Sequence, residues 1–267
     1  MRAFSSYCQK TVTVVSKNIC MLCANLNVCN IMNFKKILMA MFVATTSYST
    51  FADSFLTLEQ TPDSLAYIPK PPAFDSVDFL RDKAASDQAR TLQGTSRWQQ
   101  AIQDADLSDA NIGKPFSEAL GIEISATNTP ITYDLLKKLR TDSGNFATKA
   151  AKEHYMRMRP FVFFNTHSCT PNDEASLSKN GSYPSGHTTI GWSTALVLAE
   201  LRPERQNEIL KRGYEFGQSR VICGVHWQSD VDAGRMTGAA EVARLHADAN
   251  FMKTLKEARL ELQKKLK

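Results

Sequence analysis

The sequence predicts an all-α protein whose helices form one bundle-like domain. Apolar residues recur at helical spacing from about residue 76 to the C-terminus, and no stretch alternates long enough to predict a sheet. Among the 267 residues, 43% are hydrophobic and 22% are charged, which argues against disorder and against a collagen-like chain. Because no internal repeat or low-complexity tract divides it, the segment 53–267 is expected to be a single domain.

The first half of this segment begins as an arm and continues as helices. Residues 53–75 contain four prolines, which lack an amide donor and favour extended backbone over helix. The apolar spacing then predicts helices over 77–92, 96–105, 132–139 and 145–158. Gly144 is expected to break the chain before the last of these helices.

The second half contains the most apolar helix. The polar stretch 169–183 is expected to be a loop. Residues 188–201 are nearly all apolar or small, as in a helix that is buried on every side. Three further helices are predicted over 203–221, 227–248 and 251–267.

The positive charge of the chain belongs to its first 52 residues. The formal net charge is +5, yet residues 1–52 carry five Lys and Arg and no acidic residue. The remaining 27 cations are balanced by all 27 Asp and Glu, so residues 53–267 are formally neutral. A nucleic-acid polymer is therefore not an expected partner.

Residues 32–52 have the pattern of a signal peptide. Lys35 and Lys36 precede the apolar run 37–44, and the weakly polar stretch 45–52 that follows has small residues, Thr50 and Ala52, near its end. The apolar run is too short to span a bilayer, so we expect cleavage before Asp53, export to the periplasm and no stable membrane insertion. Residues 1–31 are expected to be an extension from a start assigned too early, because Met32 begins a complete signal.

The cysteines divide between the two parts of the chain. Cys20 and Cys23 have the spacing of zinc ligands, but no second pair accompanies them, and no metal site is expected. Cys169 and Cys223 are the two cysteines beyond residue 52. In an oxidising compartment they could form one disulfide, although the sequence cannot show whether their Cα atoms approach closely enough.

Two motifs place cations and small residues where an anion could bind. In Lys152-x6-Arg159-Pro160, the two cations are two helical turns apart and would share a face, unless they form an ordinary solvated stripe. Pro184-Ser185-Gly186-His187 directly precedes the buried helix. Small residues there would expose amide groups to an anion, and the alternative is a simple Ser N-cap.

A third motif, Ser219-Arg220-x5-His226-x3-Asp230, pairs a histidine with a carboxylate. On a helix, Asp230 would reach the His226 imidazole one turn back, fix its tautomer and leave the other ring nitrogen free to attack. The alternative is a capping histidine with a surface aspartate.

In this order, the three motifs resemble the tripartite signature of the type-2 phosphatidic acid phosphatase and vanadium haloperoxidase superfamily. The stretches 71–77, 179–187 and 217–230 further resemble the class A bacterial non-specific acid phosphatases. The resemblance covers essentially all of 53–267, whereas residues 1–31 have no counterpart in it.

The resemblance implies a helical bundle that hydrolyses a broad range of phosphomonoesters through a phosphohistidine, without metal or cofactor. It implies that His226 attacks phosphorus, that Asp230 orients His226, and that His187 protonates the leaving group and then activates water. It also implies a homo-oligomer whose small-molecule partners are phosphomonoesters and inorganic phosphate. The residues expected to bind the phosphate are Lys152, Arg159, Ser185, Gly186 and Arg220.

Other functions remain as alternatives. The same family includes nucleotide-preferring, apyrase-like phosphohydrolases, and the superfamily includes vanadate-dependent haloperoxidases. A secreted module that binds anions without catalysis would use the same pocket. An acyl-hydrolase triad is disfavoured because Tyr183 stands where a nucleophile elbow needs glycine. A metal-dependent phosphatase is disfavoured because ligands are not clustered at metal spacing.

Overall fold

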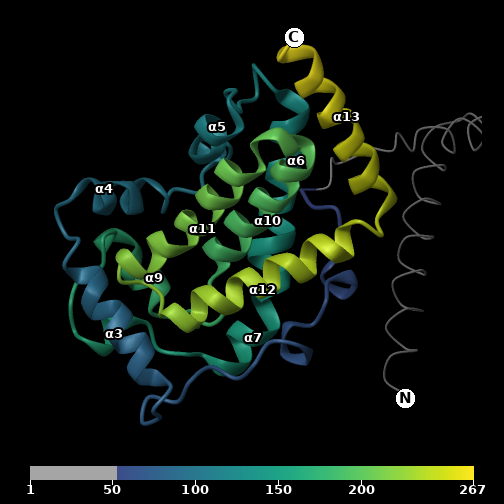
Figure 1. The fold of residues 1–267 in the computed structure, drawn as a ribbon. Coiled ribbons are helices and arrows are strands. Elements are labelled where there is room, and N and C mark those ends of the chain that lie inside the picture. Colours follow the sequence, from purple (N-terminus) through teal and green to yellow (C-terminus); the bar gives the residue numbers. More distant parts are fainter. Residues whose placement is uncertain (1–52) are drawn as a thin grey trace, which may run out of the picture. The chain divides into compact units, whose positions relative to one another are not determined.

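A computed structural model describes residues 53–267, which form helices joined by turns and loops, with no strand in that range (Figure 1). The all-α prediction is confirmed. The predicted extension 1–31, the signal peptide 32–52 and the Cys20–Cys23 spacing lie outside the described residues. The arm at the start of the described chain contains two 3-10 turns, Leu58–Gln60 and Ser64–Ala66.

The centre of the fold is α10 (Gly186–Leu201), which packs mainly against α11 (Gln206–Ile222) and α12 (Gln228–Leu245) (Figure 1). Small residues allow this close packing. A Cβ added to Gly191 would lie 2.3 Å from the Phe216 ring. All residues of α10 are buried or partly buried, so the prediction of a helix buried on every side is confirmed, and α10 begins two residues earlier than expected.

One end of the core is closed by α13 (Ala249–Lys265) and α6 (Pro130–Arg140), which pack together. The Glu261 carboxylate accepts hydrogen bonds from the amides of Ile131 and Thr132, each at 2.9 Å. These amides are in the first turn of α6, where helical partners are missing. A carboxylate from another helix therefore caps α6.

The expected break at Gly144 is wrong. Residues Thr141–Phe146 form a π-helical turn that joins α6 continuously to α7 (Ala147–Tyr155). A Cβ on Gly144 would lie 2.6 Å from Ile190 Cδ1 of α10, so glycine permits close contact between helices here. The flexibility of glycine led to the wrong expectation, because packing, rather than local propensity, determines this turn.

Three of the remaining helices, α3 (Phe79–Arg90), α4 (Ser96–Gln103) and α5 (Lys114–Leu120), pack against α11. The first two match the predicted helices 77–92 and 96–105 within two residues at each end. The short helix α5 was not predicted from the sequence. Two one-turn helices, α8 (Pro160–Phe163) and α9 (Glu174–Leu177), lie in segments where the sequence predicts no helix.

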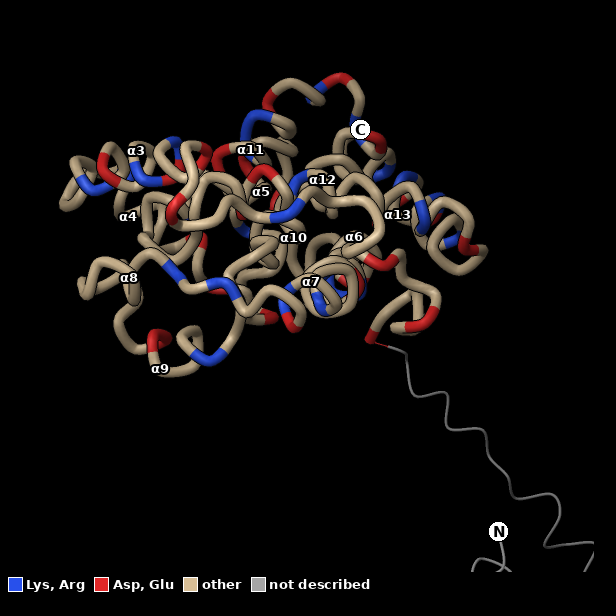
Figure 2. Tube along the Cα trace, turned by 90° about the horizontal axis from the view of Figure 1, so that it is seen from below, with Lys and Arg blue, Asp and Glu red and all other residues tan. Residues whose placement is uncertain are grey.

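Charges of both signs are mixed over the surface. Along α3 and α13, Lys and Arg alternate with Asp and Glu (Figure 2). This distribution fits the formal neutrality of 53–267. None of the helices in residues 53–267 combines the length and the apolar character needed to span a bilayer.

Cys169 and Cys223 form a disulfide. The Cys169 amide also donates to the Cys223 carbonyl at 2.8 Å, directly after α11 ends. The covalent link therefore fixes the connection after α8 to the turn 223–227, which carries His226.

Candidate active site

The site lies where α7, α10, α11 and the start of α12 meet, and it contains three cations, of which two are buried and Lys152 is partly buried. Arg159 and Arg220 are 3% and 1% exposed. Lys152 comes from the end of α7 and donates to the Gly181 carbonyl at 2.8 Å. Arg159 Nη2 donates to the same oxygen at 3.4 Å. The first and third motifs therefore bring their cations into one cluster.

The expectation that Lys152 and Arg159 share a helical face is wrong. Helix α7 ends at Tyr155, and Met156 adopts φ 41°, in the left-handed region. Arg159 is the N-cap of α8. The two cations meet because the chain turns back between them, with Gly181 packed so closely that a Cβ would lie 2.4 Å from the Lys152 carbonyl oxygen.

Arg220 is the least satisfied of the three cations. Its Nε and Nη1 atoms have no hydrogen-bond partner among the described residues, although the side chain is almost completely buried. Burial lowers its pKa, and the charge of Arg159 lowers it further. A buried guanidinium keeps its charge near neutral pH, so its free donors point to an anionic ligand.

His226 has one nitrogen fixed and the other directed at the cations. Its Nδ1 lies 3.4 Å from Asp230 Oδ2, and Arg159 Nη1 donates to its Nε2 at 3.1 Å. We assign the proton to Nδ1, because Nε2 faces a donor. Burial, together with Arg159, Lys152 and Arg220, holds the His226 pKa well below its ordinary value. At neutral pH His226 is therefore uncharged, and its Nε2 lone pair accepts the hydrogen bond from Arg159.

The pairing of His226 with Asp230 does not run along one helix, as the sequence suggested. His226 precedes α12, and Asp230 lies in its first turn. Asp230 Oδ2 also accepts from the Trp227 amide at 2.8 Å, and Oδ1 accepts from Arg157 Nη1 at 2.6 Å. The carboxylate thus caps α12 and orients the histidine. Sequence reasoning missed Arg157.

The second motif forms the start of α10. Ser185 is its N-cap, with Oγ accepting from the Thr188 amide at 3.3 Å and from the Thr188 hydroxyl at 2.9 Å. The Ser185 amide donates to the Asp230 carbonyl at 2.9 Å, which joins this motif to the third. The Gly186 position lies beside Lys152, because an added Cβ would be 3.8 Å from Lys152 Cε. The Ser N-cap interpretation is confirmed, and binding of an anion at this helix start stays a prediction.

His187 lies in the first turn of α10, close enough to Arg220, His226 and Arg159 for their charges to affect its pKa. Its Nε2 is 3.0 Å from the Ala105 carbonyl and donates to it, which leaves Nδ1 as the nitrogen for exchange of a proton. Burial and the Arg220 charge hold its pKa well below the ordinary value, and the Ala105 hydrogen bond opposes this shift.

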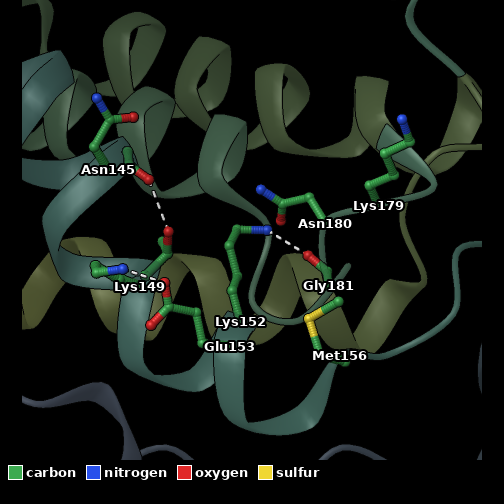
Figure 3. A pocket seen from close by; sticks show the side chains of 10 residues that line it. Asn145, Lys149, Lys152, Glu153, Met156, Lys179, Asn180 and Gly181 are labelled. Carbon is green, nitrogen blue, oxygen red and sulfur yellow. Dashed lines mark hydrogen bonds and ion pairs between the residues drawn. The ribbon is translucent and has the colours of Figure 1, made fainter. Parts of the chain in front are cut away.

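A pocket of about 370 Å³ adjoins the cluster through Lys152 and Gly181. In Figure 3, the Lys152 side chain extends from α7 to the Gly181 carbonyl, and the paired Lys149 and Glu153 lie on the same helix. Burial and Arg159 lower the Lys152 pKa to about 7. An incoming anion would favour its charged form. Among residues 53–267, no three His, Cys, Asp or Glu side chains gather as metal ligands would.

Three cations, a helix start and an oriented histidine form an arrangement that suits a phosphate dianion. Comparison with known proteins agrees, since residues 142–250 match the PAP2 superfamily. Over 210 residues, the chain is 50% identical to a non-specific acid phosphatase of Providencia stuartii, covering 79% of this chain and 85% of that protein. Over 225 residues it is 49% identical to a non-specific acid phosphatase of Salmonella typhimurium, covering 84% and 90%.

An acid phosphatase of Zymomonas mobilis is 44% identical over 203 residues, which are 76% of each chain. The protein therefore belongs to the class A acid phosphatases of the PAP2 superfamily, and it is a phosphatase enzyme. The resemblance drawn from the three motifs is confirmed.

Proposed function

We propose that this acid phosphatase hydrolyses phosphomonoesters in the periplasm through a phosphohistidine on His226, without a metal ion. The observation that carries the proposal is the buried Arg220 guanidinium, whose Nε and Nη1 donors have no partner among the described residues, in a cluster with His226, whose Nε2 faces Arg159. Such donors are suited to the equatorial oxygens of a phosphoryl group, whose transfer depends on positioning and charge neutralisation.

In the first step, the Nε2 lone pair of His226 attacks phosphorus, and the bond from phosphorus to the ester oxygen breaks. The electron pair stays on the leaving oxygen, which takes a proton from Nδ1 of His187. For this step His187 carries a proton on both ring nitrogens, because the bound phosphate dianion offsets the cations that otherwise lower its pKa. Asp230 stabilises the positive charge that develops on the His226 ring. The phosphoryl oxygens are held by Lys152, Arg159, Ser185, Gly186 and Arg220.

In the second step, His187 accepts a proton from water, and the water oxygen attacks phosphorus. The bond from phosphorus to Nε2 breaks and returns its electron pair to His226, which restores the enzyme with inorganic phosphate bound. One histidine thus acts as the nucleophile, and the other as acid and then as base.

The metal-independent part of the proposal is tested with purified residues 53–267 and p-nitrophenyl phosphate in the presence of EDTA. Full turnover is expected, because protein cations supply the charge that a metal supplies elsewhere. Loss of activity that Zn²⁺ or Mg²⁺ restores would contradict it.

The periplasmic part is tested by N-terminal sequencing of protein from the periplasmic fraction of the expressing cells. Cleavage at Ala52–Asp53 is expected. Recovery of the enzyme only from the cytoplasmic fraction would contradict export.

A further inference from the structure

A buried network outside the three motifs lies behind Asp230. Arg157 and Asp82 are 6% and 1% exposed. Arg157 Nη1 donates to Asp230 Oδ1 at 2.6 Å and to Ser229 Oγ at 2.7 Å. Its Nη2 donates to Asp82 Oδ2 at 2.8 Å and to the Pro72 carbonyl at 3.3 Å. One guanidinium therefore joins two buried carboxylates, one of which contacts His226.

Asp82 also holds the turn that carries Asp230. Its Oδ1 accepts from the Ser229 amide at 2.7 Å, and its Oδ2 accepts from the Ser229 hydroxyl at 2.6 Å. Ser229 and Asp230 are neighbours in the first turn of α12. Helix α3 thereby fixes the backbone position of Asp230 as well as the partner of its carboxylate.

Aromatic rings shield this network. The rings of Phe74 and Trp227 each lie 5.7 Å from the Arg157 guanidinium carbon, and Trp227 is fully buried. Interactions between charges are stronger in such surroundings than in water. The charge on Arg157 and the charge on Asp82 therefore both act on Asp230.

We propose that Arg157 and Asp82 are positioning residues for phosphoryl transfer. They extend the His226–Asp230 pair into a relay, by which we mean the chain of contacts His226–Asp230–Arg157–Asp82. This inference rests on the proposed function, in which His226 is the nucleophile. Arg157 orients the carboxylate so that Oδ2 faces His226, and Asp82 offsets the Arg157 charge so that this cation does not oppose the imidazolium that develops on His226.

The decisive variant is Asp82→Asn, which preserves the size of the side chain and the carbonyl that accepts from the Ser229 amide. The matched control is Asp87→Asn on the same helix, where an exposed aspartate pairs with Lys83 and Arg90. Arg157→Lys is the second variant, since it keeps a positive charge but cannot donate in two directions as a planar fork does.

The rate is measured with an alkyl phosphate, whose poor leaving group makes phosphoryl transfer slow. For Asp82→Asn and Arg157→Lys, kcat is expected to fall about tenfold or more, because misplacement of a supporting group is costly. The inhibition constant for inorganic phosphate is expected to change by less than about twofold, since the phosphate-binding residues are untouched. Asp87→Asn is expected to match the wild type in both.

The pH profile of kcat/KM separates the two possibilities, because a purely structural role of Asp82 would leave this profile unchanged. In Asp82→Asn, the Arg157 charge is no longer offset and lowers the His226 pKa, so the acid limb shifts to lower pH. Asp87→Asn leaves the limb in place. The charged and titratable groups that face His226 are unchanged in both variants: Lys152, Arg159, His187, Arg220 and Asp230.

Unchanged kcat and an unmoved acid limb in Asp82→Asn would overturn the inference. Parallel losses of kcat, phosphate binding and thermal stability would also overturn it, because they would show a structural role only. The phosphoenzyme of the wild type is trapped in the same experiments. Its absence from His226 would refute the proposed function, whereas its presence with normal Asp82→Asn kinetics would refute only the relay.

Discussion

Glu241 of α12 is a buried acid whose replacement should stabilise the protein as pH rises. Its side chain is 0% exposed, and neither carboxyl oxygen has a hydrogen-bond partner among the described residues. Burial raises its pKa from 4.5 to about 8, and the nearby Asp142 contributes to this increase. The folded protein therefore keeps this carboxyl protonated over a range in which the unfolded chain ionises it.

The sign of the effect follows from proton binding. The stability associated with the neutral Glu241 is fully present below pH 4.5 and declines as pH rises towards 8. At about 1.4 kcal/mol per pH unit, the loss between pH 4.5 and neutrality is about 3 kcal/mol. Glu241→Gln removes the ionisable group, so this part of the decline should disappear.

The assay is urea unfolding near pH 5 and near pH 7.5, with Glu257→Gln as the control, because Glu257 is an exposed glutamate of α13. Relative to the wild type, Glu241→Gln should gain about 3 kcal/mol more at the higher pH than at the lower. Glu257→Gln should show no such difference. Equal effects of Glu241→Gln at both pH values would refute the reasoning.

Three further predictions concern the site and its surroundings. Reduction of the Cys169–Cys223 disulfide should lower the free energy of unfolding by about 2–4 kcal/mol. Urea unfolding with and without dithiothreitol measures this change, and equal unfolding midpoints would contradict the prediction. Activity should follow a bell-shaped pH profile with an acidic optimum, because the pKa values of His187 and His226 both lie below their ordinary value. A profile with a single titration step would contradict the assignment of one acid and one nucleophile to these two histidines. His187→Ala should slow alkyl phosphates far more than p-nitrophenyl phosphate in burst kinetics, since p-nitrophenolate leaves without a proton, and equal losses would refute the acid role.

The sequence could point to the candidate site residues because short spacings mark them. A serine cap at a helix start and a histidine four residues before an aspartate are local patterns, and their chemistry does not depend on knowing the rest of the fold. The meeting of Lys152 with Arg159 was predicted for the wrong reason. A turn at Met156 brings them together, and it depends on packing against Gly181.

Other features were beyond local reasoning because distant segments create them. Asp82 is separated from Ser229 by 147 residues, so nothing in its own helix marks it as part of the site. Arg157 stands two residues before Arg159 and looks like one more cation of a basic stripe. Glu241 looks like a surface residue of an amphipathic helix, and only the packing of α12 shows that it is buried.

The central claim is that His226 carries the phosphoryl group, and rapid quenching with phosphorus-labelled p-nitrophenyl phosphate tests it most directly. The wild type should yield a transient phosphoenzyme mapped to His226, and His226→Ala should yield none. His187→Ala should accumulate the phosphoenzyme, because it lacks the base that activates water. Labelled protein from His226→Ala, with none from His187→Ala, would contradict the account.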